Sequence, residues 1–152
     1  MEVGLSVCIL FSFGATVGSF LHVVAERYMT GRTAFAGRSY CPYCKKTLTA
    51  GELVPLFSYI LSGAKCRECK AEIPVHYPMS ELLAGVVTVL LLLPSVMHQS
   101  GFFFPILLFV IACILIILIR IDSKTMFLPD GYIYALVFLA SIYVGIAQRD
   151  LN

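Results

Sequence analysis

The chain has 152 residues, of which 59% are hydrophobic and 13% are charged, and its mean hydropathy is +0.90. These values exclude an ordinary soluble domain, because about a quarter of the residues in such domains are charged. A domain of this size also buries only about 60–70% of its surface. We therefore expect a lipid bilayer to cover the remaining apolar surface. The net charge is only +2, and we expect no nucleic-acid partner.

The first apolar run covers residues 3–24. Glu2 precedes it and no Lys or Arg does, so it lacks the positive amino end of a signal peptide. Its roughly 20 residues are enough to cross a hydrocarbon core of about 30 Å as a helix. We assign residues 1–24 to a first transmembrane helix. Small residues in a GxxxG arrangement predict close packing against another helix: Gly14, Ala15, Gly18 and Ser19.

A polar segment follows at residues 25–78. It contains eight of the eleven Lys and Arg residues of the chain and four of its six cysteines. Arg120 and Lys124 bring the basic residues of two polar loops to ten of eleven, with Arg149 as the exception. By the positive-inside rule both loops face the cytosol and both chain ends lie outside.

Three further apolar runs make up residues 79–152, and we expect loops at residues 94–101 and 120–130 between them. The last run has about 16 residues and needs flanking residues to complete a span. The sequence thus predicts an all-α polytopic membrane protein with about four transmembrane helices and one small cytosolic insertion. The runs lie at residues 79–97, 102–119 and 132–147.

The polar segment contains two CxxC pairs, Cys41-Pro-Tyr-Cys44 and Cys66-Arg-Glu-Cys69, separated by 21 residues. Four such thiolates can close tetrahedrally around Zn²⁺ at about 2.3 Å, and a closed site of this kind is structural rather than catalytic. A redox pair and unliganded thiols are the alternatives. Because cytosolic thiols stay reduced, we favour a cytosolic tetracysteine zinc module at residues 25–78.

Three carboxylates lie where the polar segments meet the apolar runs. Asp122 lies at the predicted membrane–cytosol boundary, where an ionisable group is costly and often functional. The alternative is a solvated loop residue that pairs with Arg120 or Lys124. Asp130 follows a proline and precedes a helix, which suits an N-cap. Glu81 either caps the second predicted helix or faces a polar cavity inside the bundle.

The remaining potential ligands show no shared pattern. His22, His76 and His98 have no ligand spacing, and we predict an ordinary interfacial position for each. Cys8 and Cys113 lie in apolar runs, where a free thiol behaves as a small hydrophobe.

Five motifs in order resemble those of the type IV prepilin leader peptidases, the aspartic peptidases of the GxGD class. One departure inside them is His22, which stands where asparagine is usual. The first motif resembles GSFxNVVxxR, the fourth resembles YPxxExxxG and the fifth resembles D-x6-PD. In chain order they are Gly18-Ser-Phe-Leu-His-Val-Val-Ala-Glu-Arg27, Cys41-Pro-Tyr-Cys44, Val54-Pro-Leu-Phe-Ser58 with Gly63-Ala-Lys-Cys66-Arg-Glu-Cys69, Tyr77-Pro-Met-Ser-Glu81-Leu-Leu-Ala-Gly85, and Asp122-Ser-Lys-Thr-Met-Phe-Leu-Pro129-Asp130.

The resemblance implies a membrane aspartic endopeptidase of the bacterial cytoplasmic (inner) membrane, a hydrolase of type IV pilus, type II secretion or competence systems. It implies that Asp122 is the first catalytic aspartate, with Asp130 and Glu81 as candidates for supporting roles. The implied substrates are prepilins and pseudopilins, which such enzymes cleave at the cytosolic face after a glycine. Many members then methylate the new amino terminus with S-adenosylmethionine.

One departure from the family pattern bears on activity. The second aspartate of the family belongs to a GxGD motif, and this sequence contains no GxGD. We expect the chain to be incomplete or to need a second chain that supplies the GxGD helix, and to be inactive alone. The alternatives are a non-catalytic scaffold or assembly factor derived from the same fold, and a membrane zinc module in which Asp122 is dispensable.

Overall fold

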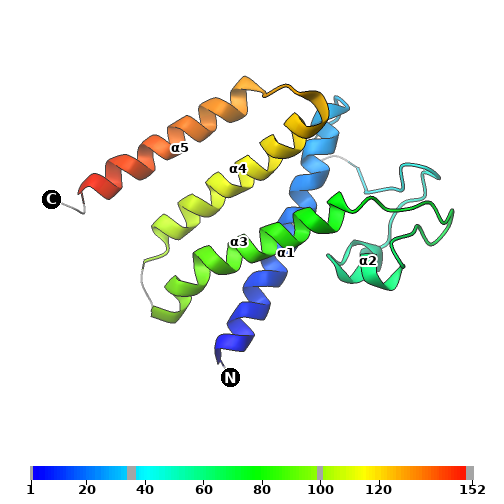
Figure 1. The fold of residues 1–152 in the computed structure, drawn as a ribbon, viewed down its shortest axis with the longest axis horizontal. Helices are drawn as coiled ribbons and strands as arrows, with labels where there is room; N and C mark the ends of the chain where they lie inside the picture. The colour runs from blue at the N-terminus through cyan, green and yellow to red at the C-terminus, as the bar shows by residue number, and fades with distance from the viewer. Residues whose placement is uncertain (1, 34–36, 99–100, 150–152) are drawn as a thin grey trace.

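The computed structural model describes residues 2–33, 37–98 and 101–149. Figure 1 shows α3, α4 and α5 running roughly alongside one another, α1 crossing α3, and the segment between α1 and α3 forming a small module at one end of them. Within the described residues no strand is longer than an isolated bridge. The predicted all-α class is confirmed. In chain order the elements are α1 (Glu2–Met29), η1 (Ala50–Leu53), α2 (Phe57–Leu61), α3 (His76–His98), α4 (Phe103–Thr125) and α5 (Asp130–Arg149).

Three of these helices, α1, α3 and α4, are long and apolar enough to cross a membrane. Large apolar side chains such as Leu90 and Ile119 are exposed on them, as expected of surfaces that contact lipid. The stretch Asp130–Ile146 of α5 is also apolar but shorter. The polytopic class is thus confirmed through three candidate spans, and a fourth span through α5 stays a prediction.

The loop predicted at residues 94–101 is too long. Helix α3 continues through Pro94 to His98, and residues 99–100 of the predicted loop lie outside the described part of the chain. A proline removes one backbone hydrogen bond from a helix, but membrane helices tolerate it because neighbouring helices and local adjustments satisfy the freed group. The drop in hydropathy at Pro94 therefore did not mark the helix end.

The loop predicted at residues 120–130 is also too long. Helix α4 continues to Thr125 and ends at Met126, which has a left-handed φ of 50° and donates its N–H to the Asp122 carbonyl at 2.8 Å. Asp122 therefore lies in the last turns of a helix and not in a loop. The apolar side chains stop at the predicted edge of the lipid. The backbone hydrogen bonds of the helix do not depend on that edge, so the helix continues beyond it. For the same reason α1 extends to Met29, past the predicted boundary at residue 24.

Helices α1 and α3 cross closely, and small residues make this possible. A Cβ atom added at Gly14 would lie 2.6 Å from the Ala84 carbonyl oxygen and would also overlap the Thr88 side chain. A Cβ atom added at Gly18 would lie 2.6 Å from the Ala84 Cβ. Real Cβ contacts at these distances do not occur, so the two backbones must separate if either glycine is replaced. The close packing predicted from the GxxxG pattern is confirmed, with α3 as the partner.

We expect Gly14→Val to destabilise the chain by about 1–3 kcal/mol, the usual cost of overpacking a tight contact. The matched control is Gly4→Val in the same helix, because nothing lies within 4 Å of a Cβ atom at Gly4. The measurement is thermal unfolding in detergent, followed by circular dichroism. Equal melting temperatures for the two variants would contradict the close crossing of α1 and α3.

A buried hydrophobic cluster joins α1 to α4. It consists of Leu21, Val24, Ala25, Ile117 and Ile121. Its packing holds the carboxyl-terminal ends of α1 and α4 together, so the residues that follow Ile121 lie beside the end of α1 that leads into the module (Figure 1).

Candidate functional site

The four patterned cysteines converge in the structure. Their Sγ atoms all lie within 4.8 Å of one another, with 3.8 Å between Cys41 and Cys69 and 4.0 Å between Cys44 and Cys66. Thiolates at about 2.3 Å from a tetrahedral Zn²⁺ are about 3.8 Å apart, whereas bonded disulfide sulfurs are about 2.05 Å apart. All four cysteines are free. The cluster therefore has the geometry of a four-thiolate metal site.

The two CxxC segments have the same backbone geometry. In each, the N–H of the first cysteine donates to the carbonyl five residues later, the residue after the second cysteine has a positive φ, and one antiparallel bridge closes the loop. The sequence shows only that both segments contain a CxxC pair. The structure shows in addition that the two segments share the same backbone hydrogen bonds. The corresponding features are the bonds Cys41–Lys46 (2.9 Å) and Cys66–Ala71 (2.8 Å), the φ angles of Lys45 (62°) and Lys70 (58°), and the bridges Tyr40–Thr47 and Lys65–Glu72.

The second segment turns backbone N–H groups toward its first sulfur. The N–H groups of Cys69 and Glu68 hold the pKa of the Cys66 thiol at about 7, below its ordinary value. Since the thiolate is the metal-binding form, these N–H groups favour metal binding at Cys66. At Cys69, despite the N–H of Ala71, burial and the neighbouring sulfurs raise the pKa of the thiol to about 11. Lys46 joins the two segments, because its Nζ lies 3.5 Å from a Glu68 oxygen and 3.4 Å from a Glu52 oxygen.

Glu81 fastens the module to the membrane helices. Its carboxylate accepts a hydrogen bond of 2.8 Å from the Leu56 N–H, and Leu56 has a positive φ of 60°, which is unusual for a leucine. Because α3 begins at His76, Glu81 is not at the helix start, and its carboxylate bonds to the module rather than to the α3 backbone. It also lines the cavity between the module and the helices. Arg27 makes a second connection between α1 and the module, because its guanidinium donates a hydrogen bond of 2.7 Å to the Gly37 carbonyl.

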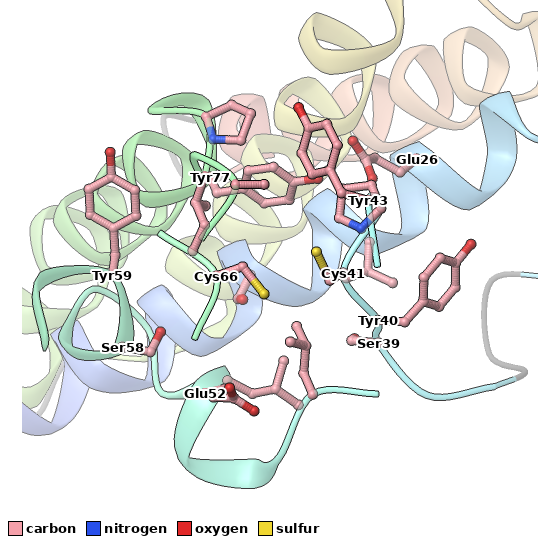
Figure 2. Close-up of a pocket in the computed structure, with 18 of the residues that line it drawn as sticks. Glu26, Ser39, Tyr40, Cys41, Tyr43, Glu52, Ser58, Tyr59, Cys66 and Tyr77 are labelled. Carbon is pink, nitrogen blue, oxygen red and sulfur yellow. The ribbon is translucent and has the colours of Figure 1, made fainter. Parts of the chain in front are cut away.

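A cavity of about 480 Å³ lies between the module and the helices α1 and α3. Figure 2 shows tyrosine rings and carboxylates around it, with the sulfurs of Cys41 and Cys66 on the module side. This volume is within the range of small-molecule sites. The tyrosines and acidic residues of the lining are Tyr40, Tyr43, Tyr59, Tyr77, Glu26, Glu52, Glu72 and Glu81.

Asp122 is exposed at the same end of the bundle as the module. Among the residues that the structure describes, its carboxylate has no ion-pair partner. Arg120 points instead to Glu26, with 3.8 Å between Nη2 and Oε1. The alternative in which Asp122 pairs with Arg120 or Lys124 is therefore not seen among the described residues, and the Asp122 carboxylate is exposed.

Asp130 begins α5 and is exposed. The Pro129 carbonyl accepts the N–H groups of Tyr132 and Ile133, which places Pro129 at the cap position and Asp130 in the first turn. There the Asp130 charge complements the helix dipole. The N-cap prediction is displaced by one residue, and no contact brings Asp130 to Asp122 in the described interactions.

Sequence reasoning missed one cluster. His22, Glu26 and His76 offer ligand atoms that all lie within 4.8 Å of one another, and the two histidine rings stack with centroids 5.2 Å apart. His22 and Glu26 are four residues apart and so share one helix face, a signal that was visible in the sequence. The approach of His76 was not visible, because it depends on the crossing of α1 and α3. We did not predict that His22 and His76 meet, and their assignment as ordinary interfacial residues stays a prediction.

Fold and site together define a helical polytopic membrane protein with a four-cysteine module, whose sulfurs have the spacing of a metal site, at one end of its helices. Residues 12–94, just over half of the chain, match the family model for the bacterial peptidase A24 N-terminal domain. The chain therefore belongs to the prepilin leader peptidase/N-methyltransferase family and contains its A24 N-terminal domain.

Relatives extend the similarity past the family model. The chain is 34% identical over 137 residues to the prepilin leader peptidase/N-methyltransferase of Bacillus subtilis (strain 168), covering 88% of this chain and 52% of the relative. It is 32% identical over 155 residues to that of Neisseria gonorrhoeae, covering 86% and 52%. The chain thus spans about half the length of these relatives, and the aligned part includes the segment around Asp122. No solved structure matches the chain.

Proposed function

We propose that the chain is the amino-terminal half of a prepilin leader peptidase in the bacterial inner membrane, and that Asp122 is the first of its two catalytic aspartates. The observation that supports this most is the position of the Asp122 carboxylate. It is exposed and without an ion-pair partner among the described residues, two residues beyond Arg120, which contacts Glu26 of the module cavity. A peptide that reaches the module end of the helices can therefore reach this carboxylate.

The chemistry requires a second carboxylate close to Asp122. In an aspartic peptidase two carboxylates share one proton, so that one acts as base on water while the other acts as acid. We propose that a GxGD element, in a further segment or in a second chain, supplies this partner. Glu81 and Asp130 have other roles in this proposal: Glu81 positions the module, and Asp130 stabilises the start of α5.

The proposal is tested by completing the enzyme. We expect no prepilin cleavage in membranes that contain the 152-residue chain alone, because one aspartate cannot serve as both base and acid. Co-expression with the carboxyl-terminal half of the Bacillus subtilis relative, which carries the region this chain does not match, should restore cleavage. The measurement is the mobility shift of a prepilin on a gel. Robust cleavage by the 152-residue chain alone would show that the second carboxylate already lies within it.

We also propose that the four-cysteine cluster holds a structural Zn²⁺ on the cytosolic side. The sulfur spacing supports the metal, and the basic residues of the module support the orientation by the positive-inside rule. The metal would join the two CxxC segments and so fix the module wall of the cavity.

The cavity supports a second candidate function, methylation of the new amino terminus with S-adenosylmethionine. Its volume of about 480 Å³ suits a ligand of this size. Tyrosine rings attract cations through their faces, and the sulfonium group of S-adenosylmethionine is a cation. The lining combines such rings with carboxylates such as Glu52.

This second proposal predicts a loss of S-adenosylmethionine binding when a lining ring is removed. In the completed enzyme, we expect Tyr59→Leu to weaken binding about two- to fivefold, because a cation–π contact contributes about 0.5–1 kcal/mol. Tyr134→Leu is the control, since Tyr134 is exposed on α5, away from the cavity. Equilibrium dialysis with the labelled ligand gives the dissociation constants. Equal binding by both variants would place the ligand elsewhere.

The competing function is a non-catalytic scaffold that retains the fold and the metal module. It predicts that the completed protein tolerates every change at Asp122. The substitution described in the Discussion separates the two functions.

A further inference from the structure

We propose that His22, Glu26 and His76 form a second metal site, distinct from the cysteines, at the junction of α1 and α3. The site would take a divalent transition metal such as Zn²⁺ through two imidazole nitrogens and one carboxylate. The three ligand atoms lie within 4.8 Å of one another. His22 Nε2 and Glu26 Oε1 are 3.6 Å apart, close to the roughly 3.4 Å that separates two ligands at about 2.1 Å from a tetrahedral metal.

The hydrogen bonds of Ser80 orient the His22 ring for this role. The Ser80 hydroxyl donates to the Tyr77 carbonyl at 2.8 Å, which uses its one proton. Its oxygen lies 3.4 Å from His22 Nδ1 and is placed to accept a hydrogen bond from that nitrogen. With a proton on Nδ1, a neutral ring would present a lone pair at Nε2, which lies 3.6 Å from Glu26 Oε1. Metal-binding histidines use this arrangement, in which the other ring nitrogen donates to an oxygen.

Both imidazoles also have an unused buried nitrogen. Within the described residues, Nε2 of His22 and Nε2 of His76 are buried without a hydrogen-bond partner, and the His22 residue is only 3% exposed. Buried polar atoms almost always have partners, so each exception calls for an explanation. A metal ion bound to one nitrogen of each imidazole and to Glu26 would give both rings a partner at the same point.

Two histidines and one carboxylate leave room in the coordination sphere. This ligand set is one that holds zinc with an open position. A separate cavity of about 190 Å³ lies against both His22 and His76, and its other lining residues are mostly apolar: Leu21, Leu83, Ile116 and Ile119, with Ser80, Ser123 and Arg120.

The positive charge of Arg120 opposes the binding of a metal ion at this site. Its Nη2 lies 3.8 Å from the same Glu26 oxygen, and its Nε and Nη2 are buried without hydrogen-bond partners in the described part of the chain. The guanidinium and the metal would therefore compete for Glu26. Removing the Arg120 charge should strengthen metal binding at this site, whereas a purely structural histidine cluster would bind no metal in either form.

The test counts metals in the full chain, purified in detergent without chelators. We expect elemental analysis to find two Zn²⁺ per chain, and the double variant His22→Gln/His76→Gln to retain one. His98→Gln is the control, because His98 is exposed at the other end of α3, and it should retain two. Arg120→Gln should lower the dissociation constant of the second metal.

Cobalt substitution identifies which site is lost. Thiolate–cobalt charge-transfer bands report the four-cysteine site, and weaker ligand-field bands report the nitrogen and oxygen site. We expect the double variant to lose the second set and keep the thiolate bands, which also shows that it remains folded. Glu26→Gln provides a milder variant with the same expected loss. One metal per wild-type chain, bound by thiolates alone, would overturn the proposal, as would two metals in the double variant.

Discussion

In the completed enzyme, Asp122→Asn should reduce prepilin cleavage on the order of 10³-fold or more while membrane insertion and zinc content stay unchanged. The amide has nearly the shape of the carboxylate but cannot exchange a proton with water at neutral pH. Proton transfer by one positioned group contributes about 10²–10⁴ to a rate. The carboxylate is exposed and in no ion pair among the described residues, so the substitution should cost little stability. Initial rates of leader removal in membranes provide the measurement.

Asp130→Asn is the matched control for this result. Asp130 is also an exposed aspartate, and it lies in the first turn of α5, where loss of its charge removes a dipole interaction of about 0.3–1 kcal/mol. Cleavage should therefore continue at a rate close to that of the unsubstituted enzyme. Full activity of Asp122→Asn would refute the aspartic-peptidase proposal and favour the scaffold. Equal loss in both variants would instead point to a shared structural role for the loop between α4 and α5.

Cys66→Ser should release the metal of the four-cysteine site and unfold the module between Met29 and His76. Cys66 is buried at 8% exposure, and its sulfur lies 4.0 Å from that of Cys44. The apparent binding energy of structural zinc in small modules is about 10–16 kcal/mol, and this is also folding energy. The regular structure of the module could not replace it, since its described residues contain one 3-10 turn, one helix of five residues and two isolated bridges.

Limited proteolysis and elemental analysis measure this second effect. We expect cleavage within the module and the loss of one metal, whereas α1, α3 and α4 stay protected in detergent. Cys8→Ser is the control, because Cys8 is exposed on α1 and outside the cluster. A module that remains resistant to protease without its metal would show that the cysteines do not hold it together.

The local parts of this protein could be predicted from the sequence. Hydropathy located the apolar helices, because lipid contact selects apolar side chains over a fixed length. The CxxC pairs predicted the four-cysteine cluster, because two cysteines three positions apart already lie in one turn of the chain. The helix ends were predicted less well. Pro94 and Arg120 interrupt the apolar pattern without ending the helix, since hydropathy reports the solvent and not the backbone hydrogen bonds.

The tertiary structure decided which distant residues meet. Gly14 and Gly18 let α1 and α3 approach, and this crossing brings His76 onto the His22 ring. The turn at Leu56 brings its N–H to Glu81, which no local pattern linked to the module. The spacing of residues along a single helix determines which of them share a face. Contacts between segments depend instead on how side chains of different sizes pack. The sequence alone therefore determined the apolar spans and the cysteine pairs. The packing of α1, α3 and α4 determined the polar cluster around Glu26.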